Sequence, residues 1–167
     1  MESNYKEKLA DINAFIFDVD GVLTDGSLII SESGELLRTM NVKDGFAMKF
    51  AIDNGFKIGI ISGGTNESVR KRLNGLGIEE IHLKSHDKIF PFNNFLEKYN
   101  LDKENVLVMG DDIPDIPIIK LAGIGCCPQD AVPEVKAVSN YISQKNGGKG
   151  CVRDVIEQVM KIQNKWI

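Results

Sequence analysis

The sequence lacks the hydrophobic segments that place a protein in or across a membrane. No apolar run approaches the roughly 18 residues that a transmembrane helix needs. Residues 1–13 are polar and contain no apolar core of a secretory signal peptide. We therefore expect no membrane partner and a cytoplasmic location.

The sequence also lacks an excess of basic charge and a pattern of paired cysteines. Lys and Arg number 20 against 24 Asp and Glu, a formal net charge of −4, which argues against a nucleic-acid partner. Only three cysteines are present, and Cys126 and Cys127 are adjacent. Because vicinal cysteines rarely pair and the count is odd, we expect three free thiols in a reducing compartment.

Length and composition indicate one globular domain over residues 1–167. Hydrophobic residues make up 43% of the chain and charged residues 26%, which is typical of a folded domain. The length of 167 residues lies within the range of roughly 100–200 expected for a single domain.

Short apolar runs alternate with amphipathic stretches along the chain. The runs at residues 14–17, 57–61, 105–109 and 123–127, with a shorter one at 81–83, are typical of strands buried on both faces. Strands that alternate with helices predict an α/β fold with a doubly wound, Rossmann-like parallel sheet. The helical positions are Phe46, Phe50 and Ile52 before Gly55; Val69, Leu73 and Leu76 before Gly77; Phe92, Phe95, Leu96 and Tyr99; and Val152, Val155, Val159 and Ile162.

The segment after the first predicted strand breaks this alternation. Two apolar stretches at residues 27–31 and 36–40 flank a polar, glycine-containing turn. This pattern predicts a β-hairpin inserted at about residues 25–41. At the other end, about residues 146–167 form a glycine-rich tail and a C-terminal helix.

Acidic residues gather where the predicted strands end. Five aspartates follow two of the strands, and Ser62 with Gly63 follows a third; the aspartates are Asp18, Asp20, Asp111, Asp112 and Asp115. Ligands of open α/β sheets bind at these ends. Carboxylates that converge there repel one another unless a cation lies among them, and an all-oxygen ligand set suits Mg²⁺. The pattern predicts a Mg²⁺ site that holds a phosphate, although each acid taken alone is also typical of a turn or a helix cap.

These residue types are those that phosphoryl transfer requires. An aspartate can be the nucleophile and form an aspartyl-phosphate. A metal ion and a lysine neutralise the transferring group, and a second acid protonates the leaving alcohol and then activates water. Gly21 after Asp20 supplies a flexible turn.

Four segments in order resemble the motifs of haloacid dehalogenase superfamily phosphatases. They are residues 17–24, residues 62–63, Lys88 and residues 110–115. Four further segments are similar to one capless branch, the 3-deoxy-D-manno-octulosonate 8-phosphate (KDO 8-phosphate) phosphatases: residues 20–26, 41–45, 85–88 and 147–150. The similarity extends from about residue 12 to 160, and residues 122–134 and 147–160 resemble Bacteroidetes-type members most.

The resemblance implies a role for each aspartate. Asp18 is the nucleophile and Asp20 the general acid and base. Mg²⁺ is held by the Asp18 carboxylate, the Asp20 backbone carbonyl and Asp111. Asp112 and Asp115 lie around these ligands or contact them through water. The implied reaction is hydrolysis of KDO 8-phosphate in lipopolysaccharide precursor biosynthesis, through an aspartyl-phosphate.

The resemblance also implies the groups that bind the substrate and the neighbouring subunit. Ser62, the Gly63 amide and Lys88 bind the phosphoryl group. Only 24 positions separate Asp20 from Asp44, too few for a large cap domain. The hairpin instead helps to build a homotetramer in which a neighbouring subunit closes the site. Candidate contacts to the sugar-acid end are Asp44, Gly45, Gly64, His86 and Lys149.

The chain departs from this branch around the sugar end of the substrate. Gly64 stands where many members have Arg, and Lys149 stands where Arg is common. A phosphatase of a nine-carbon ulosonate 9-phosphate or another small sugar phosphate therefore stays open as an alternative. A non-catalytic oligomerisation module on the same fold is a further alternative, against which the intact set Asp18, Asp20, Lys88 and Asp111 argues. Residues 147–150 are interpreted either as a flexible basic tail that reaches over a sugar acid or as a plain entry to the last helix.

Overall fold

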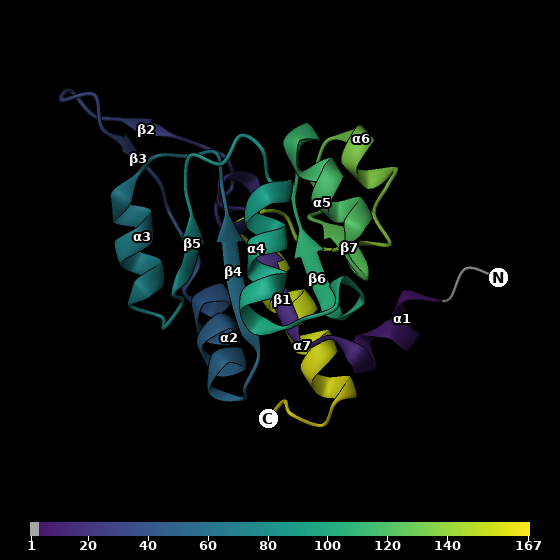
Figure 1. Ribbon diagram of the computed structural model, residues 1–167. Helices are drawn as coiled ribbons and strands as arrows, with labels where there is room; N and C mark the ends of the chain where they lie inside the picture. Colours follow the sequence, from purple (N-terminus) through teal and green to yellow (C-terminus); the bar gives the residue numbers. More distant parts are fainter. Residues whose placement is uncertain (1–3) are drawn as a thin grey trace.

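A six-stranded parallel sheet forms the centre of the computed structural model, which describes residues 4–167 (Figure 1). The spatial order of the strands is β5-β4-β1-β6-β7-β8, and every neighbouring pair is parallel. The predicted doubly wound α/β fold is confirmed. The strands are β1 (Ala14–Phe17), β4 (Lys57–Ile61), β5 (Glu80–His82), β6 (Val106–Met109), β7 (Ile124–Cys127) and β8 (Tyr141–Ile142).

The central strand β1 is buried on both faces, as its uninterrupted apolar sequence predicts. Because side chains alternate along a strand, Phe15 and Phe17 pack into one core layer and Ala14 and Ile16 into the other. Strand β8 was not predicted, since a strand of two residues contains no apolar run.

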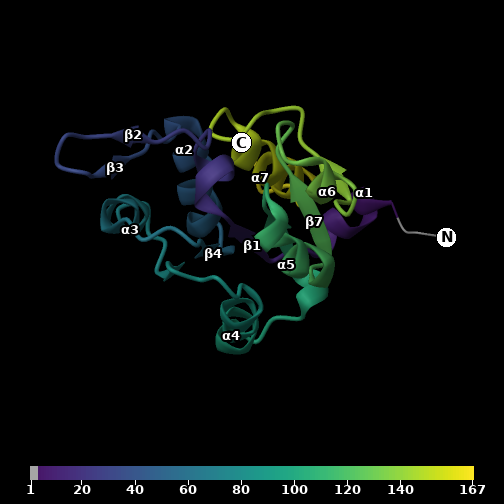
Figure 2. The same ribbon diagram turned by 90° about the horizontal axis from the view of Figure 1, so that it is seen from above.

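Helices cover both faces of the sheet (Figure 2). One core layer contains buried side chains of α2, α3 and α7, and the other contains those of α4, α5 and α6. A short helix, α1, lies near the N-terminus. The helices are α1 (Tyr5–Lys8), α2 (Val42–Asp53), α3 (Glu67–Asn74), α4 (Ile89–Tyr99), α5 (Ile116–Leu121), α6 (Pro133–Lys136) and α7 (Cys151–Ile162).

Helix α2 buries a face that differs from the one expected from its aromatic residues. Its buried apolar residues are Ala47, Met48 and Ala51, whereas Phe46 is exposed and packs beside Phe50 at its edge. Small side chains on the buried face let α2 lie close against the core, which leaves no room there for phenylalanine. Helix α3 also ends earlier than expected, at Asn74, so that Leu76 and Gly77 lie beyond it.

The predicted hairpin is present but short, and it projects from the body of the protein (Figures 1 and 2). Strands β2 (Ile29–Ile30) and β3 (Leu36–Leu37) pair antiparallel. Their apolar side chains are exposed, and Ile30 reaches 73%. Nothing between β1 and α2 resembles a cap domain in size.

The described helices and the cysteines bear on two features discussed from the sequence. Across residues 4–167, no helix is both long and apolar enough to cross a membrane. All three cysteines are free and buried.

Candidate active site

The candidate site lies where the direction of strand progression reverses in the sheet. From β1 the chain builds β4 and β5 on one side, then crosses to build β6, β7 and β8 on the other. Ligands of doubly wound folds bind at the carboxyl ends of the strands at this point. Asp18 directly follows β1, and Asp111 lies two residues after β6.

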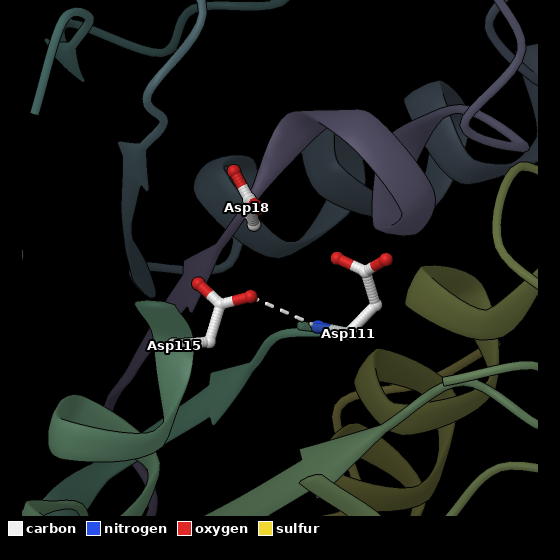
Figure 3. Close-up of side chains that lie close together, drawn as sticks. All are labelled: Asp18, Asp111 and Asp115. Atoms are coloured by element: carbon white, nitrogen blue, oxygen red, sulfur yellow. Dashed lines mark hydrogen bonds between the residues drawn. The ribbon is translucent and has the colours of Figure 1, made fainter. Parts of the chain in front are cut away.

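Three carboxylates converge there, on Asp18, Asp111 and Asp115 (Figure 3). One oxygen from each lies within 4.8 Å of the others. Asp115 ends a short 3₁₀ turn after β6, and its Oδ2 accepts the backbone N–H of Asp111 at 3.0 Å and that of Asp112 at 3.3 Å. These bonds fold the segment after β6 back on itself and bring two aspartates to one side.

A buried lysine is the cation of this cluster. Lys88 immediately precedes α4 and is only 4% exposed. Its Nζ lies 2.5 Å from Asp115 Oδ1 and 3.2 Å from Asp18 Oδ2. Burial by itself lowers the pKa of Lys88, but the charges of Asp18 and Asp115 outweigh burial and raise it. The lysine therefore stays protonated.

One lysine does not neutralise three carboxylates. Burial raises the pKa of Asp18 to about 6, with a further contribution from the charge of Asp115 and an opposing one from Lys88. Burial, followed by the charges of Asp18 and Asp115, raises the pKa of Asp111 to about 7. Asp115 is bonded to Lys88 and to backbone N–H groups, and Asp18 shares the same lysine, so Asp111 is the one carboxylate of the cluster without an ion pair among the described residues. Such oxygen ligands, short of positive charge, fit a divalent cation such as Mg²⁺.

Gly21 makes room for Asp111. Its φ is +85°, and a Cβ at this position would lie 2.0 Å from Asp111 Oδ2. The carboxylate thus occupies the space that any other side chain at position 21 would fill. The glycine after Asp20 in the sequence is therefore needed for close approach as well as for the turn.

The five aspartates do not all converge, contrary to the expectation from their sequence positions. Asp20 lies in the irregular turn Val19–Leu23, and its carboxylate pairs with Arg38 instead. Asp112 is exposed, and its side chain accepts the backbone N–H of Ile113 at 2.7 Å, which caps the 3₁₀ turn. The turns after β1 and β6 direct these two side chains away from the cluster.

Sequence reasoning missed Arg38. Its Nε lies 2.6 Å from Asp20 Oδ1, and its Nη2 lies 3.1 Å from Asp20 Oδ2. Arg38 follows β3, so its partner is 18 positions away across the hairpin. The sequence shows a single arginine in the second arm of the hairpin. A lone arginine does not indicate which carboxylate it contacts.

The expected phosphate-binding residues follow β4, next to β1. Ser62 is buried, and its Oγ accepts the backbone N–H of Gly64 at 3.2 Å. Gly63 is exposed between them. Gly64 borders Asp20, since a Cβ on Gly64 would lie 3.4 Å from Asp20 Oδ2. These residues therefore lie on the side of the site that carries Asp20.

Two of the expected substrate contacts, Asp44 and Gly45, are buried and contact neighbouring helices. Asp44 is 1% exposed, and its Oδ1 accepts the backbone N–H of Arg153 at 2.9 Å in the first turn of α7. Burial raises its pKa, and this bond and one from the backbone of Gly150 oppose the rise. Gly45 is buried against α3, where a Cβ would lie 2.8 Å from Arg72 Nη2. Both residues face neighbouring helices because they lie on the inner face of α2.

The other two candidates are accessible. His86 is exposed on the loop before α4, beside a surface hollow that Phe90 also lines. Lys149 is exposed, and its Nζ lies 3.8 Å from Asp25 Oδ2.

The glycine-rich tail is packed rather than flexible. A Cβ on Gly147 would lie 1.9 Å from the carbonyl oxygen of Gly21, and Gly148 donates its N–H to Val22 O at 2.9 Å. Asn41 Nδ2 also donates to Gly148 O at 3.3 Å. The tail therefore supports the turn after β1, and the exposed Lys149 side chain lies near Asp25.

Known proteins share both the sequence and this architecture. A family of haloacid dehalogenase-like hydrolases matches residues 74–156. The 3-deoxy-D-manno-octulosonate 8-phosphate phosphatase KdsC of Escherichia coli K12 is 34% identical over 158 residues, which cover 95% of this chain and 84% of the relative. The chain belongs to the KDO 8-phosphate phosphatase family. Within this family, the enzyme from Yersinia pestis superposes with a TM-score of 0.95 at 30% identity, covering 98% of this chain and 88% of that one.

A second solved member of the KDO 8-phosphate phosphatase family contains ligands. The enzyme from Moraxella catarrhalis was solved in complex with a magnesium ion, a phosphate ion and KDO. It superposes with a TM-score of 0.93 at 32% identity and covers 98% of this chain and 94% of that one.

Mg²⁺ is expected to raise the thermal unfolding temperature more at about pH 8 than at about pH 5. The pKa values of folded Asp18 and Asp111, about 6 and about 7, exceed the value of 3.8 for a free aspartate. Folded protein therefore keeps protons that unfolded protein has lost, and metal-free stability falls as pH rises from about 4 to about 7. Mg²⁺ binds the ionised carboxylates and reverses this loss. Calorimetry with Mg²⁺ or EDTA measures the effect, and an equal shift at both pH values contradicts it. In Asp111→Asn, the Mg²⁺ effect should disappear.

Gly21→Ala is expected to abolish stabilisation by Mg²⁺, whereas Gly26→Ala should preserve it. Both glycines have a positive φ, +85° and +81°, so each substitution costs about 1–2 kcal/mol of folding free energy. Only at position 21 does the new Cβ overlap Asp111; at position 26 the nearest atom lies 3.8 Å away. Titration with Mg²⁺, followed by calorimetry, separates the two effects. Equal Mg²⁺ responses in both variants would show that the close approach does not matter.

Proposed function

We propose that this protein is a Mg²⁺-dependent phosphatase that hydrolyses KDO 8-phosphate to KDO and inorganic phosphate, a step in lipopolysaccharide precursor biosynthesis. One observation carries the proposal: Asp18, Asp111, Asp115 and Lys88 converge at the switch point of a chain that belongs to the KDO 8-phosphate phosphatase family. The Moraxella catarrhalis relative, whose complex holds magnesium, phosphate and KDO, supports the cofactor and the substrate.

In the first step, an oxygen of Asp18 attacks the phosphorus of the substrate. The bond from phosphorus to the sugar oxygen breaks, and an aspartyl-phosphate forms. Asp20 gives a proton to the departing sugar oxygen. The Asp18 and Asp111 carboxylates and the Asp20 backbone carbonyl would hold Mg²⁺, which would supply positive charge to the transferring oxygens when bound.

In the second step, water hydrolyses the aspartyl-phosphate. Asp20 takes a proton from the water, which attacks phosphorus and releases inorganic phosphate and free Asp18. Lys88 stays protonated beside Asp18 in both steps and offsets the negative charge of the phosphoryl group. The Ser62 hydroxyl and the Gly63 amide complete the phosphate cradle.

The main alternative keeps this chemistry and changes the sugar. Gly64 borders Asp20 and offers no side chain, while His86 and Lys149 are exposed and can contact a substrate. A nine-carbon ulosonate 9-phosphate presents the same phosphate and a longer sugar. A non-catalytic module is disfavoured, because a scaffold has no use for buried, uncompensated carboxylates.

We further propose that the hairpin assembles the chain into a homotetramer in which a neighbouring subunit closes the site. Five apolar side chains of the hairpin are exposed: Leu28, Ile29, Ile30, Leu36 and Leu37. A two-stranded hairpin is marginally stable by itself, so this one gains stability from a surface that buries these residues. A single domain over residues 1–167 and a cytoplasmic location, which suits three free thiols, belong to the same proposal.

Asp18→Asn is expected to abolish phosphate release and leave the fold intact, because an amide is a poor nucleophile and a poor metal ligand. Phosphate release from KDO 8-phosphate, a nine-carbon ulosonate 9-phosphate and p-nitrophenyl phosphate is measured with Mg²⁺ and with EDTA. Asp53→Asn, at an exposed aspartate of α2, is the control and should be fully active. Full activity of Asp18→Asn overturns the nucleophile assignment. A higher kcat/KM for the nine-carbon substrate overturns the choice of sugar, and the absence of phosphate release from all three substrates excludes the enzyme.

Ile30→Lys is expected to dissociate the assembly, because it places a charge in the centre of the proposed apolar contact. Sedimentation velocity compares the variant with wild type and with Ile162→Lys, an exposed isoleucine at the end of α7. Only Ile30→Lys should sediment as a smaller species. A monomeric wild-type protein rules out the tetramer.

A further inference from the structure

The ion pair between Arg38 and Asp20 joins the hairpin to the reacting centre. The guanidinium contacts both carboxylate oxygens of Asp20, at 2.6 Å and 3.1 Å. This two-bond geometry restricts the carboxylate in both distance and rotation, unlike a contact to a single oxygen. The Asp20 side chain is 37% exposed, whereas that of Arg38 is 8% exposed. The arginine is thus the fixed partner and the aspartate the accessible one.

Arg38 is itself held from behind. Its Nη1 donates to the backbone carbonyl of Leu36 at 3.0 Å, and the same carbonyl accepts the side-chain amide of Asn66 at 2.8 Å. Asn66 is the N-cap residue of α3, where its Oδ1 accepts the backbone N–H of Ser68. The base of the hairpin is therefore anchored to α3, and the guanidinium is aimed at Asp20 from a supported position.

The pair also separates Asp20 from the carboxylate cluster. Asp18, Asp111 and Asp115 share one lysine, and a divalent cation bound to Asp18 and Asp111 would attract any free carboxylate nearby. Asp20 is two residues from Asp18, so without Arg38 its side chain is free to turn toward that cation. An aspartate that has become a metal ligand can no longer transfer protons to the leaving oxygen. Arg38 competes with the cation for this carboxylate.

We propose that Arg38 is the positioning residue that holds the Asp20 carboxylate at the point where the leaving oxygen departs and water later enters. The inference rests on the proposed function, in which Asp20 is the general acid and base. It adds that the hairpin is part of the catalytic apparatus, because a shift of the hairpin carries the guanidinium, and with it Asp20, toward or away from the phosphoryl group.

Steady-state kinetics with Mg²⁺ provide the first test. Arg38→Met should lower kcat for KDO 8-phosphate on the order of 10²-fold, the usual effect of displacing a reacting group by about 1 Å, with KM nearly unchanged. Arg38→Lys, which can contact one carboxylate oxygen, should recover part of the rate. Arg153→Met is the matched control, since Arg153 is also partly buried and pairs with a carboxylate, that of Glu157 on α7. It should retain wild-type activity.

The leaving group distinguishes positioning of Asp20 from damage to the fold. Nitrophenolate leaves without a proton, so Arg38→Met should transfer the phosphoryl group of p-nitrophenyl phosphate to Asp18 at nearly the wild-type rate. Attack by water still needs Asp20 to accept a proton. The aspartyl-phosphate should therefore accumulate, and rapid mixing should show a burst of nitrophenolate approaching one per active site. A loss of folded protein would lower the burst instead.

A double-mutant cycle completes the design. If Arg38 acts through Asp20, Arg38→Met should change the rate with p-nitrophenyl phosphate little in an Asp20→Asn background. Wild-type kcat in Arg38→Met, a raised KM with unchanged kcat, or an equal loss of rate in both backgrounds overturns the inference. A different result contradicts the proposed function, namely that the wild-type protein releases no phosphate from any substrate.

Discussion

Electrostatic repulsion among three converging carboxylates, one buried and two half-buried, is the constraint on which this structure depends. Asp18, Asp111 and Asp115 meet at the ends of the two central strands, and Lys88 is the cation that they share. Burial first, and then the charges of neighbouring aspartates, raise the pKa values of Asp18 and Asp111, so the fold holds these groups in a place that disfavours their ionised forms. A divalent cation relieves the repulsion, so the charges that destabilise the metal-free protein also favour the binding of a metal ion.

The scaffold withstands this repulsion through close backbone contacts around the turn after β1. Gly147 packs against the backbone of Gly21 from one side, and Asp111 occupies the space beside Gly21 on the other. The tail that contains Gly147 is fixed in turn by α2, whose Asp44 caps the first turn of α7. Asp44, which was expected to contact substrate, and the glycine-rich tail thus hold the turn after β1 and its carboxylates in place.

The hairpin takes the place that a cap domain would fill, and it differs from the rest of the protein in having almost no core of its own. Its apolar side chains are exposed, while its base carries a nearly buried arginine that holds Asp20. One short element therefore connects the proposed subunit contact with the proposed acid and base. The backbone carbonyl of Leu36, which accepts bonds from Arg38 and Asn66, ties the base of the hairpin to α3.

The sequence by itself determined the features that depend on neighbours along the chain. Apolar runs defined five of the six strands of the main sheet, and acids directly after strands defined Asp18 and Asp111, because the carboxyl ends of parallel strands share one edge. Only the tertiary structure decided which carboxylates converge and which turn away. Asp20 pairs with Arg38, which lies 18 positions away along the chain. Asp44 accepts the backbone N–H of Arg153 in the first turn of α7, 109 positions away. Such partners are set by the packing of whole elements, and no local pattern of residues records them.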